Sequence, residues 1–147
     1  MVQIHATSIS INAHAVLFRG PSGSGKSDLA LRMIDRGAKL VSDDRCNLEV
    51  SEDRIMVTAP ETISGLMEIR GVGVVNIGTE PFASLALIVD LVSPEEMDRM
   101  PEKKVCTEYG AEIPVIKMTP FEASTPAKVL IALSVALGEM ESLSELP

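Results

Sequence analysis

The sequence predicts an α/β fold that forms one domain over residues 1–147, and three observations lead to this prediction. A length of 147 residues suits one compact domain. Short apolar runs typical of buried strands recur along the chain, as at 15–18 and 85–92. Apolar residues at helical spacing follow Lys26 and again Thr125. This alternation of strand and helix patterns favours a sheet with flanking helices.

Composition excludes several classes of protein. Hydrophobic residues make up 46% of the chain, which excludes wholesale disorder. The net charge of -8 and the scarcity of aromatic residues argue against nucleic acid as a partner. No apolar run approaches the roughly 20 residues of a membrane helix, and no secretory signal opens the chain, so we expect a cytoplasmic protein without a membrane partner. Cys46 and Cys106 lack metal-site spacing and are expected to be reduced thiols.

The first third of the chain predicts three strands and a helix. The strands are expected, in order, over 2–11, 15–18 and 39–42. We expect a bulge near Thr7-Ser8 and a turn at 12–14. The helix runs from Lys26 to Arg36, and Gly37 is placed to cap it in the left-handed conformation. Its buried face is expected to comprise Leu29, Ala30, Met33 and Ile34.

The middle of the chain predicts a β-hairpin formed by 47–50 and 54–58. Its inward-facing residues are expected to be Leu48, Val50, Ile55 and Val57. The segment 60–67 is interpreted as a helical turn with Thr62 or Ser64 near its cap. The glycine-punctuated segment 70–78 is interpreted as a loop followed by a strand.

The last third predicts two strands, at 85–92 and 113–118. The first of them is expected to be central because its apolar character is unbroken. Between them, 93–110 is charged and contains two prolines, so we expect an exposed, mobile excursion. A helix then begins with Thr125 as N-cap and Pro126 at its first position. Its apolar face is expected to comprise Val129, Leu130, Leu133 and Leu137, and fraying is expected over 139–147.

One motif carries a specific chemistry. Residues 20–27 match the phosphate-binding pattern G-x-x-x-x-G-K-[ST] and are Gly20, Pro21, Ser22, Gly23, Ser24, Gly25, Lys26 and Ser27. An apolar strand enters the loop and a helix leaves it, so backbone N–H groups and the helix dipole can meet phosphate oxygens. Lys26 is expected to contact the β- and γ-phosphates, and the Ser27 hydroxyl to ligate Mg²⁺. The motif predicts binding of a nucleoside triphosphate.

Two apolar strands end in aspartate, and either could serve such a site. Leu87 to Asp90 has the pattern of a hydrophobic run followed by a carboxylate, for which a strand-end cap is the alternative. Asp43 and Asp44 follow the strand after the loop helix, for which turn chemistry is the alternative. We favour Asp43 and Asp44, because the carboxyl end of that strand is expected to face the phosphate loop.

The order of several motifs resembles the catalytic domain of the HPr kinase/phosphorylase family, whose members act on a serine of the phosphocarrier protein HPr. The resemblance rests on His5, the phosphate loop, the run Arg36-Gly37-Ala38-Lys39-Leu40-Val41-Ser42-Asp43-Asp44-Arg45 and the run Met67-Glu68-Ile69-Arg70-Gly71-Val72-Gly73-Val74-Val75-Asn76. It extends over about 5–76 and more weakly to the last helix. It implies a phosphate-loop kinase fold akin to phosphoenolpyruvate carboxykinase, with a mixed sheet, and the cofactors ATP and Mg²⁺.

The resemblance also implies roles for individual residues. Asp44 resembles the carboxylate that takes the seryl proton, and Asp43 and His5 resemble its neighbours. Ser27 and Glu68 resemble the magnesium-site residues. Arg70 resembles a phosphate-facing residue and Arg99 a charge stabiliser in a mobile loop. From the residues alone, His5 could equally be a satisfied strand histidine, and Glu68 with Arg70 a plain ion pair.

The resemblance implies an HPr-like protein as substrate and a homo-oligomer, a hexamer in the family. Members usually carry an N-terminal domain, which we expect to be missing because the first predicted strand begins almost at Met1. They also tend to carry a basic stretch before the last helix, where 122–128 holds one lysine. The kinase activity is expected, and the reverse phosphorylase activity is left open. The alternatives are a small-molecule kinase and a nucleotide-binding regulator without turnover.

Overall fold

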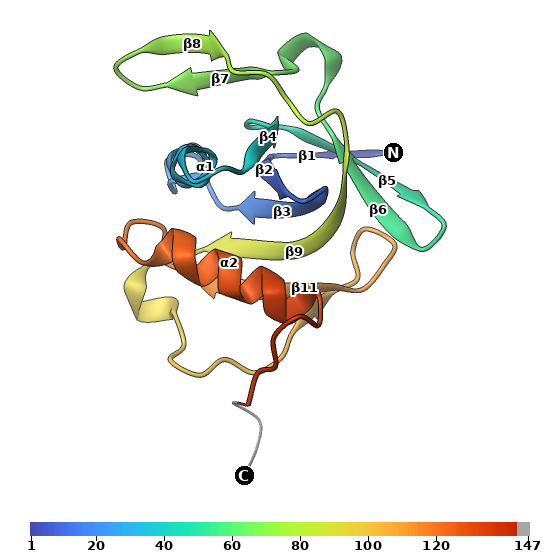
Figure 1. Cartoon of the computed structure of the whole chain (residues 1–147), viewed down its shortest axis with the longest axis vertical. Helices are drawn as coiled ribbons and strands as arrows, with labels where there is room; N and C mark the ends of the chain where they lie inside the picture. Colours follow the sequence, from blue (N-terminus) through green and yellow to red (C-terminus); the bar gives the residue numbers. More distant parts are fainter. Residues whose placement is uncertain (144–147) are drawn as a thin grey trace.

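The structure is a computed structural model that describes residues 1–143, and its centre is one curled sheet (Figure 1). Within these residues nine strands join this sheet in the order β1-β5-β6-β9-β3-β2-β4, with β11 beside β9 and β10 beside β11. The strands are β1 (Val2–Ile4), β2 (Ala6–Ile11), β3 (His14–Arg19), β4 (Lys39–Ser42), β5 (Cys46–Ser51), β6 (Arg54–Thr58), β9 (Ala83–Leu91), β10 (Val105–Cys106) and β11 (Ile113–Met118). The predicted α/β class with a mixed sheet is confirmed.

Strand β9 is the centre of the sheet, as its unbroken apolar run predicts. It runs parallel to β3 on one side and to β11 on the other, and β6 pairs antiparallel with its first two residues. Leu87, Ile88 and Val89 are buried on its two faces. A strand covered on both faces has no place for alternating polar residues, which is why its sequence is continuously apolar.

Strand β2 separates β3 from β4 and runs antiparallel to both. The carboxyl ends of β3 and β4 therefore lie at the same edge of the sheet as the amino end of β2. Strands β3 and β4 are not neighbours in the sheet, since β2 lies between them. This inserted strand brings His5 and Thr7 to the edge where the phosphate loop begins.

Both long helices, α1 (Lys26–Asp35) and α2 (Thr125–Ala136), contribute to one core on one face of the sheet. Leu29 and Met33 of α1 and Val129 and Leu133 of α2 pack there. The opposite face has its own core, which is formed by β5, β6 and the start of β11 curling over β3 and β9. No helix in residues 1–143 is long and apolar enough to cross a membrane.

A second, two-stranded sheet lies over α1 and is formed by β7 (Leu66–Ile69) and β8 (Gly73–Asn76) (Figure 1). Met67 is buried in the helix-covered core and anchors this hairpin. The loop followed by a strand that the glycine pattern indicated at 70–78 is confirmed. The predicted helical turn at 60–67 is shorter, since only the 3-10 turn η1 (Glu61–Ile63) forms and Pro60, instead of Thr62 or Ser64, precedes it.

The first predicted strand, 2–11, is divided at His5. The reason is a change of partner: β1 pairs with β5, whereas β2 pairs with β3 and β4. The irregularity expected near Thr7-Ser8 lies one step later, where the register against β4 shifts between Ser8 and Ile9. The turn after β2 comprises Asn12 and Ala13, both with positive φ, so His14 begins β3 instead of lying in the turn.

Two residues predicted to face the core are exposed instead. Val50 is 49% exposed because the tip of the β5–β6 hairpin projects beyond the core. Leu130 is 36% exposed because it lies about 100° around the helix from Val129, which faces the sheet. The other members of both predicted faces are buried or partly buried.

The start of α2 also differs from the prediction. Ser124 occupies the N-cap position and Thr125 is already helical, so Pro126 is the second residue of the helix. The Thr125 side chain is fully buried, and its hydroxyl donates to the carbonyl of Thr119 at 2.7 Å. That tertiary hydrogen bond replaces the capping bond that the sequence indicated.

The excursion 93–110 is mostly exposed, as predicted, and its mobility stays a prediction. It contains the 3-10 turn η2 (Pro94–Glu96) and strand β10, in which Cys106 is buried against β11. The fraying expected over 139–147 falls partly outside the described residues.

Candidate functional site

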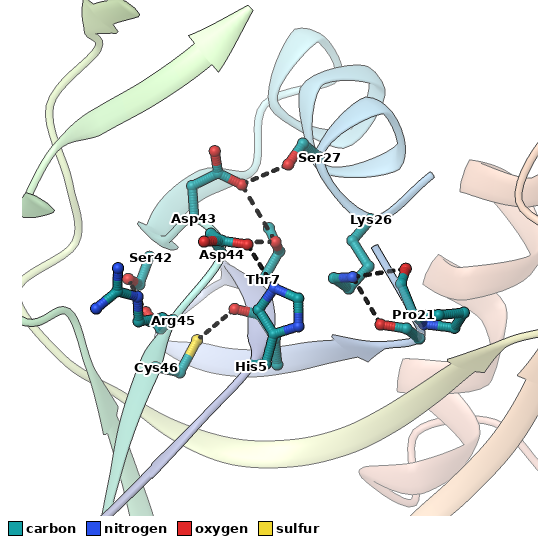
Figure 2. A network of polar contacts seen from close by, with 12 residues as sticks. His5, Thr7, Pro21, Lys26, Ser27, Ser42, Asp43, Asp44, Arg45 and Cys46 are labelled. Carbon is teal, nitrogen blue, oxygen red and sulfur yellow. Dashed lines mark hydrogen bonds and ion pairs between the residues drawn. The ribbon is translucent and has the colours of Figure 1, made fainter. Parts of the chain in front are cut away.

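The phosphate loop connects β3 to α1, and Gly23 and Gly25 within it have φ of 81° and 97°. These left-handed conformations favour glycine and turn the loop backbone toward the amino end of the helix. Lys26 is 6% exposed, and its Nζ donates to the carbonyls of Gly20 at 2.6 Å and Pro21 at 3.0 Å (Figure 2). Burial lowers the pKa of Lys26, while Asp44 and Asp43 act in the opposite direction. The lysine thus lies folded back on the loop that a phosphate would occupy.

The loop fits a phosphate by its hydrogen-bonding chemistry. The Ser24 hydroxyl is buried, and it is the single buried side-chain polar atom within residues 1–143 that lacks a hydrogen-bond partner. An unpaired buried hydroxyl is costly, and a phosphate oxygen would accept a hydrogen bond from it. Gly20 leaves room for this hydroxyl, because a Cβ at position 20 would lie 2.5 Å from the Ser24 Oγ.

Asp43 connects the end of β4 to the first turn of α1. Its Oδ1 accepts hydrogen bonds from the hydroxyl of Ser27 at 2.6 Å and from that of Thr7 at 3.2 Å (Figure 2). Asp43 is 8% exposed and Thr7 is fully buried. One helix and one strand separate Ser27 from Asp43 in the sequence. Their side chains meet because β4 returns to the edge of the sheet from which α1 departs.

This pair of oxygens fits a magnesium ion. Hydroxyl and carboxylate oxygens are ligands that Mg²⁺ prefers, and it usually binds through one or two carboxylates together with substrate phosphates. No group of three or more His, Cys, Asp or Glu residues that could hold a metal occurs in the described part of the chain. A site here would therefore depend on Ser27, Asp43 and the phosphates of a nucleotide.

Asp44 points away from Asp43 and faces His5 (Figure 2). Its backbone has φ of 70°, in the left-handed region, and its N–H donates to the Thr7 hydroxyl at 3.1 Å. The Asp44 Oδ1 lies 2.6 Å from Nε2 of His5. Both side chains are half exposed or more, at 61% for Asp44 and 50% for His5. A carboxylate held by an imidazole is thus presented to solvent beside the phosphate loop.

Thr7 is the functional residue that sequence reasoning missed. Its hydroxyl joins both aspartates, since it donates to the Asp43 carboxylate and accepts from the Asp44 N–H. The available signal was its position two residues after His5, which puts both side chains on one face of an extended segment. A threonine in a strand is otherwise ordinary, so the signal has meaning only once β2 is known to lie between β3 and β4.

The structure does not connect three of the predicted site residues to this cluster. Glu68 of β7, Arg70 in the turn after it and Arg99 in the 93–110 excursion are all exposed. Within residues 1–143, none of them forms a hydrogen bond or ion pair with the phosphate loop or the aspartates, and Glu68 does not pair with Arg70. Their roles in catalysis and in magnesium binding stay predictions.

The competing aspartate, Asp90, has a different environment. Arg19 donates to both of its carboxylate oxygens, from Nε at 2.7 Å and from a terminal nitrogen at 2.9 Å. The remaining terminal nitrogen of Arg19 donates to the Tyr109 hydroxyl at 3.1 Å. Asp90 is thus the partner of an arginine, which favours Asp43 and Asp44 as the carboxylates of the site.

Comparisons with known proteins agree on one family. The family model described as HPr Serine kinase C-terminal domain matches residues 1–140. The HPr kinase/phosphorylase of Limosilactobacillus reuteri is 36% identical over 96 residues, which cover 60% of this chain and 30% of that protein. That of Caldanaerobacter subterraneus subsp. tengcongensis is 33% identical over 129 residues, covering 82% and 40% respectively.

A solved structure of the Hpr(Ser) kinase/phosphatase from Coxiella burnetii has the same fold, with a TM-score of 0.83 at 25% identity. The match covers 97% of this chain and 100% of that chain. By contrast, the chain spans only 30% of the length of the Limosilactobacillus relative.

Proposed function

Because the chain belongs to the family of HPr serine kinase C-terminal domains, we propose that it transfers the γ-phosphoryl group of ATP to a seryl hydroxyl of an HPr-like phosphocarrier protein. One observation carries the proposal: Asp43 after β4 is joined at 2.6 Å to Ser27 in the first turn of the phosphate-loop helix, and the next residue, Asp44, presents its carboxylate to solvent beside it. A phosphate site and a carboxylate for the attacking oxygen thus meet at one edge of the sheet. The names of the relatives support the choice of substrate.

The loop would hold the β- and γ-phosphates of ATP. Its backbone N–H groups and the Ser24 hydroxyl supply donors, and Lys26 supplies a positive charge. The Lys26 ammonium bonds two loop carbonyls, and it would exchange these neutral partners for phosphate oxygens. A bond between the ammonium and a negatively charged phosphate oxygen is stronger than one to a neutral carbonyl, which favours the exchange.

Ser27 and Asp43 are the residues that would hold a magnesium ion beside these phosphates. When bound, Mg²⁺ neutralises the charge of the phosphate oxygens. Glu68, which the family resemblance adds to this set, is exposed on β7 and stays a prediction.

Asp44 would accept the proton of the seryl hydroxyl. Its Oδ1 is bound to His5, while its Oδ2 accepts no hydrogen bond within residues 1–143 and is available to a hydroxyl donor. The carboxylate is 61% exposed, so a serine on the surface of a second protein can reach it. A seryl hydroxyl is a weak nucleophile, and a base within hydrogen-bond distance accelerates its attack.

The test uses the protein with γ-labelled ATP, Mg²⁺ and a purified HPr-like protein, beside the variants Asp44→Asn and Lys26→Ala. We expect label on a serine of the acceptor with the unmodified protein and almost none with either variant. Equal transfer by Asp44→Asn would refute the assigned base. Transfer to small molecules alone would establish a small-molecule kinase, and ATP binding without any transfer would establish a regulator.

Three further properties stay predictions at this stage: a single catalytic domain over 1–147, a cytoplasmic location and a homo-oligomer such as a hexamer. The names of the relatives also include a phosphorylase. The same acceptor carrying a phosphoserine, incubated with inorganic phosphate, measures that reverse reaction.

A further inference from the structure

We propose that Phe121 forms one face of a nucleobase subsite, on which the base of the bound nucleotide stacks. The inference rests on the proposed function only insofar as the phosphate loop takes a nucleoside triphosphate. It adds to that function a residue outside the phosphate loop and the aspartate cluster, in the turn between β11 and α2.

The ring of Phe121 lies directly against the phosphate loop. A Cβ at Gly25 would meet Cζ of this ring at 2.9 Å and Cε1 at 3.0 Å, and the Cβ of Pro120 at 3.2 Å. Gly25 is the residue from which α1 begins. Because phosphates bind at the amino end of this helix, the sugar and base of the same nucleotide must lie within reach of the residues that border it.

Phe121 is 68% exposed although it is a large apolar residue. Its edge contacts the loop, and most of its surface faces solvent. Phe18 is fully buried in the core, and Phe82 is exposed before β9, at the end of that strand opposite to Leu91 and the phosphate loop. Phe121 is therefore the phenylalanine that combines exposure with contact to the loop.

The turn that carries Phe121 is held firmly by its backbone. Arg32 of α1 donates to the carbonyl of Pro120 and to that of Glu122, the latter at 3.3 Å, and is itself held by Asp28 at 3.0 Å. The Thr125 hydroxyl donates to the carbonyl of Thr119. The exposed ring is thus anchored to the same helix that carries Lys26, which is the preorganisation that a stacking surface needs.

Arg32 and Glu122, the charged residues that flank this turn, are already paired. Arg32 is bound to Asp28, and Glu122 accepts from Lys128 at 2.9 Å. An aromatic surface without free donors or acceptors recognises the flat face of a base and not its edge. We therefore expect ATP and GTP to bind with affinities that differ by less than about tenfold.

The chain contains no tryptophan, which permits a direct measurement. Phe121→Trp places a single indole at the subsite, and Phe82→Trp places one at a distant exposed position as the matched control. We expect ATP to quench the fluorescence of Phe121→Trp and to leave that of Phe82→Trp unchanged. Inorganic tripolyphosphate, which has no base, should displace ATP but cause no such quenching.

Calorimetry on variants without tryptophan measures the affinity for ATP. It distinguishes stacking of the base on Phe121 from packing of Phe121 against the loop. Phe121→Ala should weaken ATP binding about tenfold and leave tripolyphosphate binding unchanged, because only the base loses its partner. Phe121→Tyr should bind as the original protein does, whereas Phe121→Leu, which keeps the apolar contact with Gly25, should behave like Phe121→Ala.

The subsite is refuted if Phe121→Leu binds ATP as tightly as the original protein, since Phe121 would then only pack on the loop. Quenching of Phe121→Trp by tripolyphosphate as strong as that by ATP refutes it equally. If the unmodified protein does not bind tripolyphosphate at all, the result is a different one, because it refutes the phosphate site and the proposed function together.

Discussion

Strands β4 and β9 are both apolar, both end in or near aspartate, and both point their carboxyl ends to the same edge of the sheet, yet their aspartates have different partners. Asp43 and Asp44 are bound by hydroxyls and an imidazole. Asp90 is bound through both oxygens by the guanidinium of Arg19. In the sequence the two sites look alike, because each aspartate follows an apolar strand. Only their hydrogen-bond partners distinguish them.

The difference shows what makes a carboxylate available for chemistry. A bidentate arginine occupies both oxygens of Asp90 with charged donors and raises the pKa of Arg19 well above its ordinary value. The partners of Asp43 are neutral, and one oxygen of Asp44 accepts no hydrogen bond in the described residues. An incoming cation or hydroxyl therefore finds acceptor capacity at the end of β4 and little at the end of β9.

The largest expected effect separates the two aspartates by activity. Asp44→Asn should lower kcat for transfer to the acceptor protein by about 10²–10⁴-fold, because a general base contributes that much. Asp90→Asn should change kcat by less than about threefold, because Asp90 contacts neither Lys26 nor Ser27. Steady-state rates of both variants give the ratio, and a similar loss in both would abolish the distinction.

The next effect concerns stability, and here we expect the substitution of Asp90 to be the costly one. Asp90→Asn removes the bidentate carboxylate from the guanidinium of Arg19, which is 24% exposed, and leaves it only the more distant carboxylate of Glu108 at 3.9 Å. The substitution should lower the free energy of unfolding by about 2 kcal/mol in urea. The looser pair Lys39–Glu80, at 3.6 Å and with a lysine that is 72% exposed, is the control, and Glu80→Gln should cost less than about 0.5 kcal/mol. Equal costs would mean that Arg19–Asp90 behaves as an ordinary surface pair.

The last effect is a pH dependence beside Asp43. Burial, with a lesser effect of the Asp43 charge, raises the pKa of the Cys46 thiol from 9.0 to about 12. The unfolded thiol loses its proton above pH 9 while the folded one keeps it, so stability is fully present below that pH and declines as pH rises toward 12.

Between about pH 8 and about pH 10.5 the original protein should therefore lose more stability than Cys46→Ala in urea unfolding. The comparison uses the difference between the two pH values, because the lost packing of the thiol affects both equally. Parallel decline of the two proteins would show that Cys46 ionises freely and that the surroundings of Asp43 are more open than the structure indicates.

Much of the local structure could be predicted from the sequence. Strands 39–42 and 113–118 match β4 and β11 residue for residue, and the phosphate loop and its helix begin where the motif indicates. These elements depend on near neighbours in the chain, through apolar periodicity and the conformational freedom of glycine.

The predictions are wrong where a residue distant in the sequence determines the local structure. His5 breaks a strand because β1 and β2 pair differently, and Thr125 leaves its capping role for the carbonyl of Thr119.

The sequence by itself determined the phosphate loop, the paired aspartates and, through the order of its motifs, the family. Each is a local pattern in which residue type and spacing already specify the chemistry. Only the tertiary structure decided which aspartate an arginine occupies, because Arg19 precedes Asp90 by 71 positions and meets it through parallel pairing of β3 and β9. It likewise decided that β2 lies between β3 and β4 and brings His5 and Thr7 to the site, since strand order is a property of the whole sheet.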